Sequence, residues 1–580
     1  MKISQLTSAL SVTPQLQEAD IRDVAAQGFR TLICNRPAKE SDDQPDMPSL
    51  ENACQAAGLQ WAYLPVISGQ ITDQDIQDFG TLLENLPKPI LAFCRTGTRS
   101  TILWAMNEAR AGRVQSALDT ASAAGYDLSA QQPRMQELAN ANATFTAPAR
   151  KHDVVIIGGG AAGLAVASSL LKRQGDLDIA IIEPRDTHYY QPGWTMVGGG
   201  IFTPQETGKP MADVMPEQST WYRSEVSGMM PDQQSVMLKD GTVLAYRTLV
   251  VAAGLSLNWE GIQGLKETLG QHGVTSNYHY DTAPYTWELV QKTRKGKALF
   301  TQPPMPIKCA GAPQKAMYLS CDHWLKSGVL PDVEVEFCTA GGALFGVAAY
   351  VPALMEYIEK YGIGLNFMHN LVEVDGPNKT AVFSVTDKEG TVTQVEKSFD
   401  MLHVCPPQRA PEFIRGSSLA DAAGWLDVDP QTLRHKTYGN VFALGDCANS
   451  PNAKTAAAVR QQAPVVAENV LLSLSGRQPQ AAYDGYGSCP LTVERGKIVL
   501  AEFGYGGKLL PTFPTWLLEG KRPSRLSWML KANMLPWLYW NAMLKGREWL
   551  AAPDYLSTTE LKEKAEQACD FTGNSSAKKP

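Results

Sequence analysis

Runs of apolar, mostly β-branched residues alternate with helical stretches along most of the chain. The run from Val154 to Ile157 is followed by a helical stretch and by a second run from Ile179 to Ile182. Continuous apolar runs of this length are typical of parallel strands that are buried on both faces. A strand, a helix and a second strand form one βαβ unit. The pattern therefore predicts an α/β fold around residues 153–183.

The first part of the chain shows the same alternation on a smaller scale. Three apolar runs with strand character are separated by helical stretches, and they are Arg30–Cys34, Gln60–Leu64 and Pro89–Phe93. We therefore expect a separate α/β domain over residues 1–140. Residues 141–151 are small and polar and include a proline, which predicts a linker.

More strand patterns follow the linker, and each leads into a glycine turn. They are Thr248–Gly254, Pro331–Thr339 and Gly439–Ala443. The order of strands and turns predicts two Rossmann-like halves over residues 152–505. After them we expect a C-terminal segment over residues 506–560 and a frayed polar tail over residues 561–580.

The composition changes this picture mainly by what it excludes. The 580 residues carry a net charge of −7, which argues against a nucleic-acid surface. The chain has no apolar run of about 18 residues that would cross a bilayer, and it does not open on a secretory signal. Its ten cysteines show neither a disulfide framework nor paired C-x-x-C spacings, so no metal site is expected. Any disulfide is then more easily explained as catalytic than as structural.

A glycine-rich turn follows the first strand of the βαβ unit. Gly158, Gly160 and Gly163 have the G-x-G-x-x-G spacing at the start of a helix. These glycines allow a tight turn, a close approach to a pyrophosphate, and close packing of helix on strand. The helix N-terminus attracts phosphate. Glu183 ends the next strand, 20 residues after Gly163, where a carboxylate holds ribose hydroxyls. Strand, turn, helix and acid together predict a dinucleotide site.

A second signal distinguishes FAD from NAD. The strand at residues 439–443 leads into Gly445 and Asp446, and flavoproteins with two dinucleotide domains use such an aspartate on the ribityl and pyrophosphate region of FAD. The two motifs in this order resemble those flavoproteins, and the resemblance implies bound FAD. The further positions that we assign to the cofactor are Ala161, Ala162, Pro184, Gln191, Ala253, Gly254, Lys454 and Thr455.

The second strand–turn–helix pattern departs from a nicotinamide site. Gly341 and Gly342 are adjacent and Gly346 comes late, so the G-x-G-x-x-G spacing is missing. The next strand, at residues 363–368, ends without an acid suited to a ribose. We therefore expect this half not to hold NAD(P)H, and the reductant to be a small molecule.

A reactive cysteine is predicted in the N-terminal domain. The strand that ends at Phe93 leads directly into Cys94-Arg95-Thr96-Gly97-Thr98-Arg99-Ser100 and then into a helix. Converging backbone N–H groups at such a turn stabilise a thiolate, which makes Cys94 a nucleophile. Arg99 adds a two-pronged contact for an anion.

This loop resembles two related families. Tyrosine phosphatases use Cys-x5-Arg, whereas the four residues between Cys94 and Arg99 match the smaller C-R-x-G-x-R loop of rhodanese sulfurtransferases. The wider domain resembles, over about 110 residues, the phosphatase-like domain that is fused to β-lactamase-like hydrolases. Loop size favours a sulfane sulfur carried on Cys94. A phosphatase and an inactive docking domain remain the alternatives.

The rest of the chain resembles the mitochondrial type of sulfide:quinone oxidoreductase. The motifs that carry this resemblance are 308–320, 401–404, 421–429, 454–459, 483–491 and 500–503, within a match from about 151 to 550. The resemblance implies tandem Rossmann-like domains of the FAD-dependent disulfide-reductase type. It also implies that Cys309 and Cys489 are the redox pair and that Lys454 lies near the flavin. No cysteine lies between Gly254 and Cys309, which supports the two-cysteine type.

The reaction that this resemblance implies oxidises hydrogen sulfide. Hydrosulfide attacks the Cys309–Cys489 bridge, Cys489 keeps the sulfane sulfur, and Cys309 faces the flavin. Lys308, next to Cys309, would favour its thiolate. A thiol such as glutathione, or sulfite, then accepts the sulfur, and a membrane quinone accepts the electrons. The alternatives are an NADH:quinone dehydrogenase, a sulfide dehydrogenase that reduces a cytochrome, and a sensor with a vestigial flavin.

The C-terminal segment has the pattern of amphipathic helices at a membrane surface. Residues 521–551 carry six lysines or arginines and one glutamate, interleaved with Trp, Tyr, Leu and Met. We expect Pro536 to split the segment into two short helices and the chain to lie on the cytoplasmic face of the inner membrane as a peripheral protein. The alternatives are a packing helix pair or the contact of a homodimer. Candidate residues for a quinone channel are Phe503, Tyr505, Trp537 and Tyr539.

Overall fold

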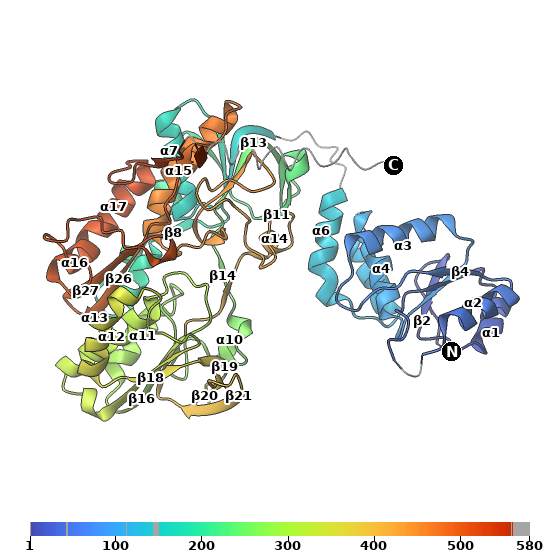
Figure 1. The fold of residues 1–580 in the computed structure, drawn as a ribbon, viewed down its shortest axis with the longest axis horizontal. Coiled ribbons are helices and arrows are strands. Elements are labelled where there is room, and N and C mark those ends of the chain that lie inside the picture. Colours follow the sequence, from blue (N-terminus) through green and yellow to red (C-terminus); the bar gives the residue numbers. More distant parts are fainter. Residues whose placement is uncertain (1, 42–43, 112, 143–149, 558, 561–580) are drawn as a thin grey trace. The chain divides into compact units, whose positions relative to one another are not determined.

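The computed structural model describes the chain except residues 1, 42–43, 112, 143–149, 558 and 561–580 (Figure 1). The described residues fall into two compact units, Met1–Pro148 and Ala149–Pro580. Most of the predicted linker and all of the predicted tail lie outside the described residues. The structure is of the predicted α/β class in both units.

Unit 1 is built on one five-stranded sheet in the order β1-β2-β5-β3-β4. Its strands are β1 (Ser4–Gln5), β2 (Leu10–Thr13), β3 (Thr31–Cys34), β4 (Gln60–Tyr63) and β5 (Ile90–Phe93). Its helices are α1 (Asp20–Ala26), α2 (Met47–Ala56), α3 (Asp73–Asn85), α4 (Thr98–Arg110), α5 (Val114–Ala123) and α6 (Gln132–Asn142). The central strand β5 is fully buried because helices cover both faces of the sheet.

The first half of unit 2 is the predicted dinucleotide fold. Its sheet has the order β10-β7-β6-β13-β12-β11, and β24 pairs with β13. The strands are β6 (Arg150–Ile157), β7 (Ile179–Ile182), β10 (Ser219–Tyr222), β11 (Val226–Met230), β12 (Ser235–Leu238), β13 (Val243–Val251) and β24 (Val441–Ala443). Two helices, α7 (Ala161–Arg173) and α15 (Ala456–Leu474), pack beside each other against this sheet (Figure 1).

The second half of unit 2 has a parallel sheet of its own in the order β15-β22-β16-β17-β18. These strands are β15 (Val274–Thr275), β16 (Gly296–Gln302), β17 (Val333–Thr339), β18 (Gly364–Phe367) and β22 (Met401–His403). Helices α11 (Ala283–Lys292), α12 (Ala312–Lys326) and α13 (Val351–Tyr361) belong to this half, as does a three-stranded antiparallel sheet. That sheet is β19 (His369–Asp375), β20 (Thr380–Thr386) and β21 (Val392–Ser398).

Short elements complete the unit. They are α8 (Trp194–Val197), α9 (Met211–Val214), α10 (Leu265–Thr268), α14 (Glu412–Arg415), β8 (Thr187–Tyr189), β9 (Gly208–Pro210), β14 (Ser256–Leu257), β23 (Gln408–Arg409), β25 (Ala481–Ala482) and β28 (Asp554–Tyr555). A hairpin of β26 (Gly487–Glu494) and β27 (Lys497–Phe503) leads into the C-terminal segment.

The C-terminal segment runs along one side of unit 2 in red in Figure 1. It contains two short helices, α16 (Arg525–Met529) and α17 (Leu535–Asn541), as predicted. However, Pro536 does not separate them, because it sits in the first turn of α17, where proline is tolerated. The two helices are joined by a π-helical turn at Leu530–Met534, so the backbone stays helical across the junction.

The surface of this segment is unusually apolar. Between residues 516 and 550, all of which the structure describes, eight large hydrophobic side chains are exposed, from Met534 and Leu526 at 43% to Trp516 at 84%. We call these eight residues the apolar C-terminal surface; they are Trp516, Leu517, Leu526, Met529, Met534, Trp537, Trp549 and Leu550. Among the described helices, none has both the length and the apolarity that a membrane crossing would need.

Candidate active site

The predicted cofactor residues meet at one edge of the first sheet of unit 2. Strands β6, β7, β13 and β24 are parallel, so their carboxyl ends lie together. Gly158, at the end of β6, has a φ of 105°, and a Cβ atom there would lie 2.5 Å from the carbonyl oxygen of Ala252. A Cβ atom on Gly163 would lie 1.8 Å from the carbonyl oxygen of Gly158. Only glycine fits at these two positions.

The residues of this edge fit FAD. A Cβ atom on Gly160 would meet no other atom within 4 Å, so the space beside the N-terminus of α7 is open for a pyrophosphate. The carboxylate of Glu183 accepts hydrogen bonds from the backbone N–H groups of Gly159 and Arg185, both at 2.9 Å. Pro184 follows Glu183 directly, and Ala253 packs against Gly158.

The Gly445–Asp446 turn lies beside the glycine loop. A Cβ atom on Gly445, which has a φ of 76°, would lie 3.1 Å from the Cβ atom of Ala162. Lys454 donates through Nζ to the carbonyl oxygens of Asp446, at 2.8 Å, and Ala448, at 2.7 Å. The ammonium group of Lys454 is therefore committed to holding this turn, and burial lowers its pKa. Thr455 caps the N-terminus of α15.

The two predicted redox cysteines face each other. The Sγ atoms of Cys309 and Cys489 are 3.9 Å apart, although 180 residues separate them in the chain. Cys489 lies on β26, whereas Cys309 lies in the turn before α12 with a positive φ of 48°, which is uncommon for a residue with a side chain. A Cβ atom on Gly311 would lie 2.6 Å from Cys489 Sγ, so the close approach of the two sulfurs depends on this glycine.

The turn that carries Cys309 is attached to the cofactor edge. The backbone N–H of Cys309 donates to the carbonyl oxygen of Lys454 at 2.9 Å. The hydroxyl of Tyr278 donates to the carbonyl oxygens of Lys308 and Cys309, at 3.2 and 3.3 Å. The cysteine pair and the Asp446 turn are thus parts of one hydrogen-bonded site.

Electrostatics distinguishes the two sulfurs. Lys315, on α12, donates through Nζ to Cys309 Sγ at 3.1 Å. A hydrogen bond from Cys489, together with the positive charges of Lys315 and Lys531, lowers the pKa of Cys309 well below its ordinary value. The same hydrogen bond and burial raise the pKa of Cys489. Cys309 is therefore the thiolate of the reduced pair, and Cys489 is the thiol that donates to it.

Lys531 belongs to the site although its sequence context suggested a lipid-facing role. It comes from the π-helical turn of the C-terminal segment, it is 6% exposed, and its Nζ donates to the carbonyl oxygen of Pro490 at 3.1 Å. Burial and the nearby Lys315 charge lower the pKa of Lys531 to about 7. The only sequence signal for this role was a lysine within an otherwise apolar stretch of helix.

Lys308 interacts with Cys309 through its charge, since a Coulombic interaction with Cys309 raises the pKa of Lys308 against the effect of burial. Its Nζ donates to Oε1 of Gln191 at 2.6 Å rather than to a sulfur atom. The positive charge beside the Cys309 thiolate comes chiefly from Lys315 and Lys531. Lys315 lies in the first turn of α12 and its side chain reaches the Cys309 sulfur, whereas the side chain of Lys308 points to Gln191. Gln191, predicted to bind the cofactor, is the acceptor of this hydrogen bond from Lys308.

The glycine loop is also linked to the C-terminal segment. His188 is buried, and its Nδ1 lies 3.1 Å from the carbonyl oxygen of Gly159. Because a carbonyl oxygen only accepts, Nδ1 carries the proton, and Nε2 accepts from the hydroxyl of Tyr539 at 2.7 Å. Burial lowers the pKa of His188 to about 4, so the imidazole is neutral near pH 7. One side chain thus joins the dinucleotide loop to α17.

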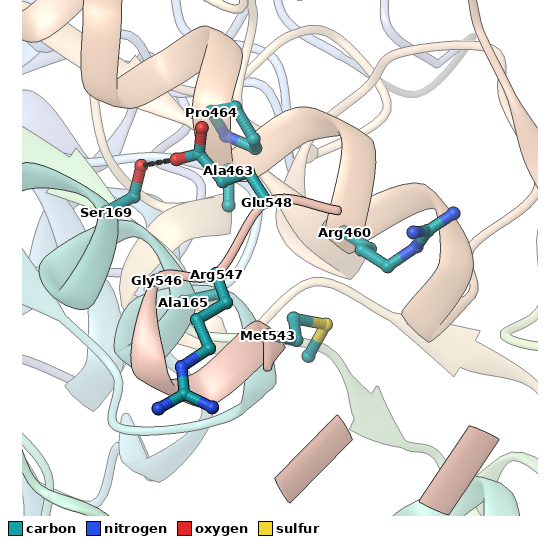
Figure 2. Close-up of a pocket in the computed structure, with 9 residues that line it drawn as sticks. All are labelled: Ala165, Ser169, Arg460, Ala463, Pro464, Met543, Gly546, Arg547 and Glu548. Carbon is teal, nitrogen blue, oxygen red and sulfur yellow. Dashed lines mark hydrogen bonds between the residues drawn. The ribbon is translucent and has the colours of Figure 1, made fainter. Parts of the chain in front are cut away.

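A second set of contacts ties the end of the segment to α7 and α15. Ser169 and Arg173 bind the carboxylate of Glu548, and Ser168 donates to the carbonyl oxygen of Leu544 at 2.8 Å. These contacts surround a small hollow that contains none of the predicted site residues (Figure 2). Its lining consists of Ala165, Ser169, Arg460, Ala463, Pro464, Met543, Gly546, Arg547 and Glu548. The hollow is a seam of the docked segment rather than a reaction chamber.

The four residues predicted to line a quinone channel contact different neighbours. Phe503 packs edge-on against Phe345, and Trp537 stacks on Trp549 at the surface. Tyr505 donates to the carbonyl oxygen of Pro430, and Tyr539 is held by His188 as described. The described contacts therefore do not group these four side chains around one channel.

The second half of unit 2 lacks the turn geometry of the first half. Helix α7 begins at Ala161, directly after the glycines. In the second half β17 ends at Thr339, residues 340–347 form an irregular turn, and α13 begins only at Val351. The backbone N–H groups of that helix are therefore not presented directly after the strand, where a pyrophosphate would need them.

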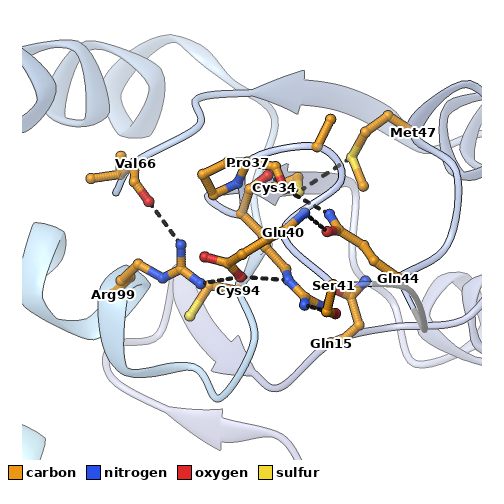
Figure 3. Close-up of polar contacts among 12 residues, drawn as sticks. Gln15, Cys34, Pro37, Glu40, Ser41, Gln44, Met47, Val66, Cys94 and Arg99 are labelled. Atoms are coloured by element: carbon orange, nitrogen blue, oxygen red, sulfur yellow. Dashed lines mark hydrogen bonds and ion pairs between the residues drawn. The ribbon is translucent and has the colours of Figure 1, made fainter. Parts of the chain in front are cut away.

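Unit 1 places Cys94 as predicted between β5 and α4. The thiol is buried, and the backbone N–H of Gly97 donates to its Sγ at 3.2 Å. Gly97 has a φ of 89° and precedes α4 directly. The guanidinium of Arg99 donates to the carbonyl oxygen of Val66 and to the carboxylate of Glu40, both at 2.8 Å (Figure 3).

Fold and site together define a flavin-dependent oxidoreductase of the disulfide-reductase class. The family model "Pyridine nucleotide-disulphide oxidoreductase" matches residues 152–285. The chain is 41% identical over 395 residues to the mitochondrial sulfide:quinone oxidoreductase of Mus musculus, which covers 68% of this chain and 87% of the relative. The chain therefore belongs to the sulfide:quinone oxidoreductase family, which confirms the resemblance found in the sequence. Membership implies FAD as the cofactor and quinone as the electron acceptor.

The solved structures agree on the fold. The sulfide:quinone oxidoreductase of Aquifex aeolicus has a TM-score of 0.57 at 19% identity, and the match covers 69% of this chain and 92% of that structure.

Residues 2–111 match the family model "Beta-lactamase hydrolase-like protein, phosphatase-like domain". The Beta-lactamase hydrolase-like protein of Agrobacterium fabrum is 33% identical over 132 residues, which are 22% of this chain and 31% of that protein. The predicted resemblance of the N-terminal domain is thereby confirmed.

The role of Lys531 can be tested through the reactivity of Cys309. In the reduced enzyme, Lys531→Met should raise the apparent pKa for alkylation of Cys309 by about one unit, or ~1.4 kcal/mol, because a positive charge beside the thiolate is lost. Lys545→Met, which removes an exposed lysine from the same segment, should leave this titration unchanged. The measurement is the rate of iodoacetamide labelling against pH. Equal titrations in all three proteins would contradict the role of Lys531.

The link through His188 predicts a remote effect on the cofactor. Tyr539→Phe removes one buried hydrogen bond worth ~1 kcal/mol and should release FAD about fivefold faster than the parent protein. The rate of flavin fluorescence recovery after dilution measures this release. Trp537→Phe, an exposed aromatic change two residues away, is the control. If both variants release FAD at the parent rate, the hydrogen bond does not support the glycine loop.

Proposed function

We propose that this chain oxidises hydrogen sulfide through the Cys309–Cys489 pair and passes the electrons by way of FAD to a membrane quinone. The observation that carries the proposal is the 3.9 Å approach of the two sulfurs beside Lys315, inside a site attached to the cofactor edge. Such an asymmetric pair suits thiol–disulfide exchange, since one sulfur is stabilised as the leaving thiolate. FAD, when bound, supplies the two-electron acceptor.

The protein's own residues account for the first step. Hydrosulfide attacks Cys489 Sγ of the oxidised pair, a bond forms between its sulfur and Cys489, and the Cys309–Cys489 bond breaks. The electron pair of that bond leaves with Cys309, whose thiolate is stabilised by Lys315 and Lys531. Sulfide is thereby oxidised to a sulfane sulfur on Cys489, and the disulfide is reduced.

Transfer of the sulfane sulfur completes the sulfur chemistry. A thiol or sulfite attacks the outer sulfur of the Cys489 persulfide and leaves as a persulfide or thiosulfate, and Cys489 becomes a thiolate. The Cys309–Cys489 bond must then form again with the loss of two electrons, and FAD, when bound, would accept them. Lys315 and Lys531 keep Cys309 ready for this closure because they favour its thiolate over its thiol. Lys454 and Tyr278 hold the Cys309 turn in position throughout.

The C-terminal segment supports a peripheral membrane association. Along the chain, the residues of its apolar C-terminal surface alternate with exposed basic side chains, among them Lys521, Arg522, Arg525 and Arg547. Apolar side chains beside basic ones suit the interface between acyl chains and anionic head groups. We propose that this surface rests on the cytoplasmic face of the membrane, from which the quinone reaches the site.

For the N-terminal domain we propose a sulfurtransferase role. The support is a nucleophile loop of only four residues between Cys94 and Arg99, with a backbone N–H aimed at the sulfur. A persulfide made in the sulfide reaction is a suitable donor, since its outer sulfur can pass to Cys94 without any net oxidation.

Anaerobic addition of sulfide tests the main proposal. Sulfide should bleach the flavin absorbance of the parent protein. A quinone analogue added afterwards should restore this absorbance. Cys309→Ser and Cys489→Ser should abolish the bleaching, because no disulfide is left to attack. Cys321→Ala, which removes a buried cysteine of α12 outside the pair, is the matched control. Bleaching by NADH but not by sulfide would instead indicate an NADH:quinone dehydrogenase.

Exposure of the full-length protein to glutathione persulfide tests the N-terminal role. The peptide that contains Cys94 should gain one sulfur atom, detected by mass spectrometry after alkylation, and Cys94→Ser should remove this product. The control variant Cys54→Ala, which replaces a buried cysteine of α2, should still form the Cys94 persulfide. Turnover of aryl phosphates without any Cys94 persulfide would assign a phosphatase instead.

A further inference from the structure

Two buried arginines lie next to the Cys94 loop in unit 1. Arg36 follows β3 and is 2% exposed, and Arg99 in α4 is 6% exposed. The strands that lead to Arg36 and to the Cys94 loop are adjacent, since β3 pairs with β5 in parallel. Two buried guanidinium groups in one place require a counter-charge, because an unpaired buried cation is costly.

Within the described part of unit 1, the carboxylate of Glu40 pairs with both guanidinium groups. Oε2 of Glu40 accepts from Nε of Arg36 at 2.7 Å and from Nη2 of Arg99 at 2.8 Å (Figure 3). Three further donors of the two arginines reach Gln15 Oε1, Ser41 Oγ and the carbonyl oxygen of Val66. Among the ion pairs of the described residues, the carboxylate of Glu40 is therefore shared by both guanidinium groups.

Glu40 is also the accessible member of this cluster. Its side chain is 28% exposed in the ion pairs, whereas those of Arg36 and Arg99 are 3% and 7% exposed. The hydrogen bond from Arg99 lowers the pKa of Glu40, so the carboxylate is ionised near pH 7. A carboxylate that arrives from solvent would meet the arginines on the side that Glu40 occupies. It would make the same charge-assisted hydrogen bonds.

We propose that Arg36 and Arg99 form a subsite for the carboxylate of a small thiol persulfide, and that Glu40 is an internal ligand which this substrate displaces. The proposal rests on the sulfurtransferase function proposed above and names its substrate class. Arg99 connects the subsite to the chemistry, because it lies in the first turn of α4, five residues after Cys94, and Figure 3 shows the two side chains beside each other. The charge of Cys94 also helps to raise the pKa of Arg99, against the effect of burial.

The transfer that this subsite would serve is balanced. The Cys94 thiolate attacks the outer sulfur of the donor, a bond forms between Cys94 Sγ and that sulfur, and the donor's S–S bond breaks. The electron pair of the broken bond leaves with the donor as a thiolate. No oxidant or reductant is needed, and the N–H of Gly97 remains near the reacting sulfur.

A purely structural role for Glu40 and a role in competition with the substrate predict different effects on the rate of sulfur transfer to Cys94. If Glu40 only orients Arg99, then its loss should slow every transfer to Cys94. If Glu40 competes with the substrate, its loss should speed transfer from a donor with a carboxylate and leave a donor without one unchanged.

The experiment compares two donors on the full-length protein. Glutathione persulfide carries carboxylates and cysteamine persulfide carries none. The readout is the second-order rate of sulfur gain on the Cys94 peptide by quenched mass spectrometry. We expect the parent protein to prefer glutathione persulfide. Glu40→Gln should increase that preference severalfold, and Arg36→Met should decrease it about tenfold, or ~1.4 kcal/mol. Glu84→Gln, an exposed carboxylate change in α3, is the matched control.

A competition measurement covers the case that Arg36→Met does not fold. Succinate should slow sulfur transfer from glutathione persulfide but not from cysteamine persulfide, and it should compete better in Glu40→Gln. Slower transfer from both donors in Glu40→Gln, or a preference that succinate does not alter, would overturn the subsite while leaving the sulfurtransferase function intact. No Cys94 persulfide from either donor in the parent protein would overturn both.

Discussion

The ion pair between the Cys309 thiolate and the Lys315 ammonium is the contact on which the rest of the active site depends. It is buried, so its strength comes from the absence of competing water, and the loss of one partner would leave the other charge uncompensated. The surrounding structure holds its two ends separately. Helix α12 carries Lys315, while the backbone of Lys454 and the hydroxyl of Tyr278 fix the Cys309 turn. The adjacent Lys531 comes from a third element, the C-terminal segment. A charged cluster assembled from distant parts of the chain therefore forms only when the whole of unit 2 is folded.

Two copies of a strand–turn–helix pattern serve different purposes in this unit. In the first half the glycines stand directly before α7, and the carboxyl ends of the parallel strands present a nucleotide site. In the second half an irregular turn separates β17 from α13. The second sheet instead supports α12, which holds Lys315 against the pair, and β26 packs beside α12 with Cys489. A region that holds a second nucleotide in a two-nucleotide enzyme thus serves here to build a sulfur site.

Local pattern predicted most of the fold and part of the site. The strands around Gly158 and Cys94 were found because apolar runs and glycine turns are properties of neighbouring residues. The approach of Cys309 to Cys489 followed only from family resemblance, since no local signal links residues so far apart. Lys315 and Lys531 were missed because their roles depend on which way a helix faces. Pro536 was expected to break a helix, and it was tolerated because it lies in a first turn after a π-helical junction. Glu40 was missed because an ion pair with Arg99, 59 residues away, leaves no trace in sequence.

The neutral imidazole of His188 gives the molecule a form of thermodynamic linkage. It accepts from Tyr539 on the C-terminal segment and donates to the loop that faces the nucleotide, so order at one end favours order at the other. Coupling of this kind is reciprocal in binding free energy. Any surface that immobilises the segment would therefore slow the escape of the nucleotide, and a filled nucleotide site would strengthen the grip on that surface by the same factor. Binding of the C-terminal segment to such a surface and retention of the nucleotide are then linked by the same coupling free energy.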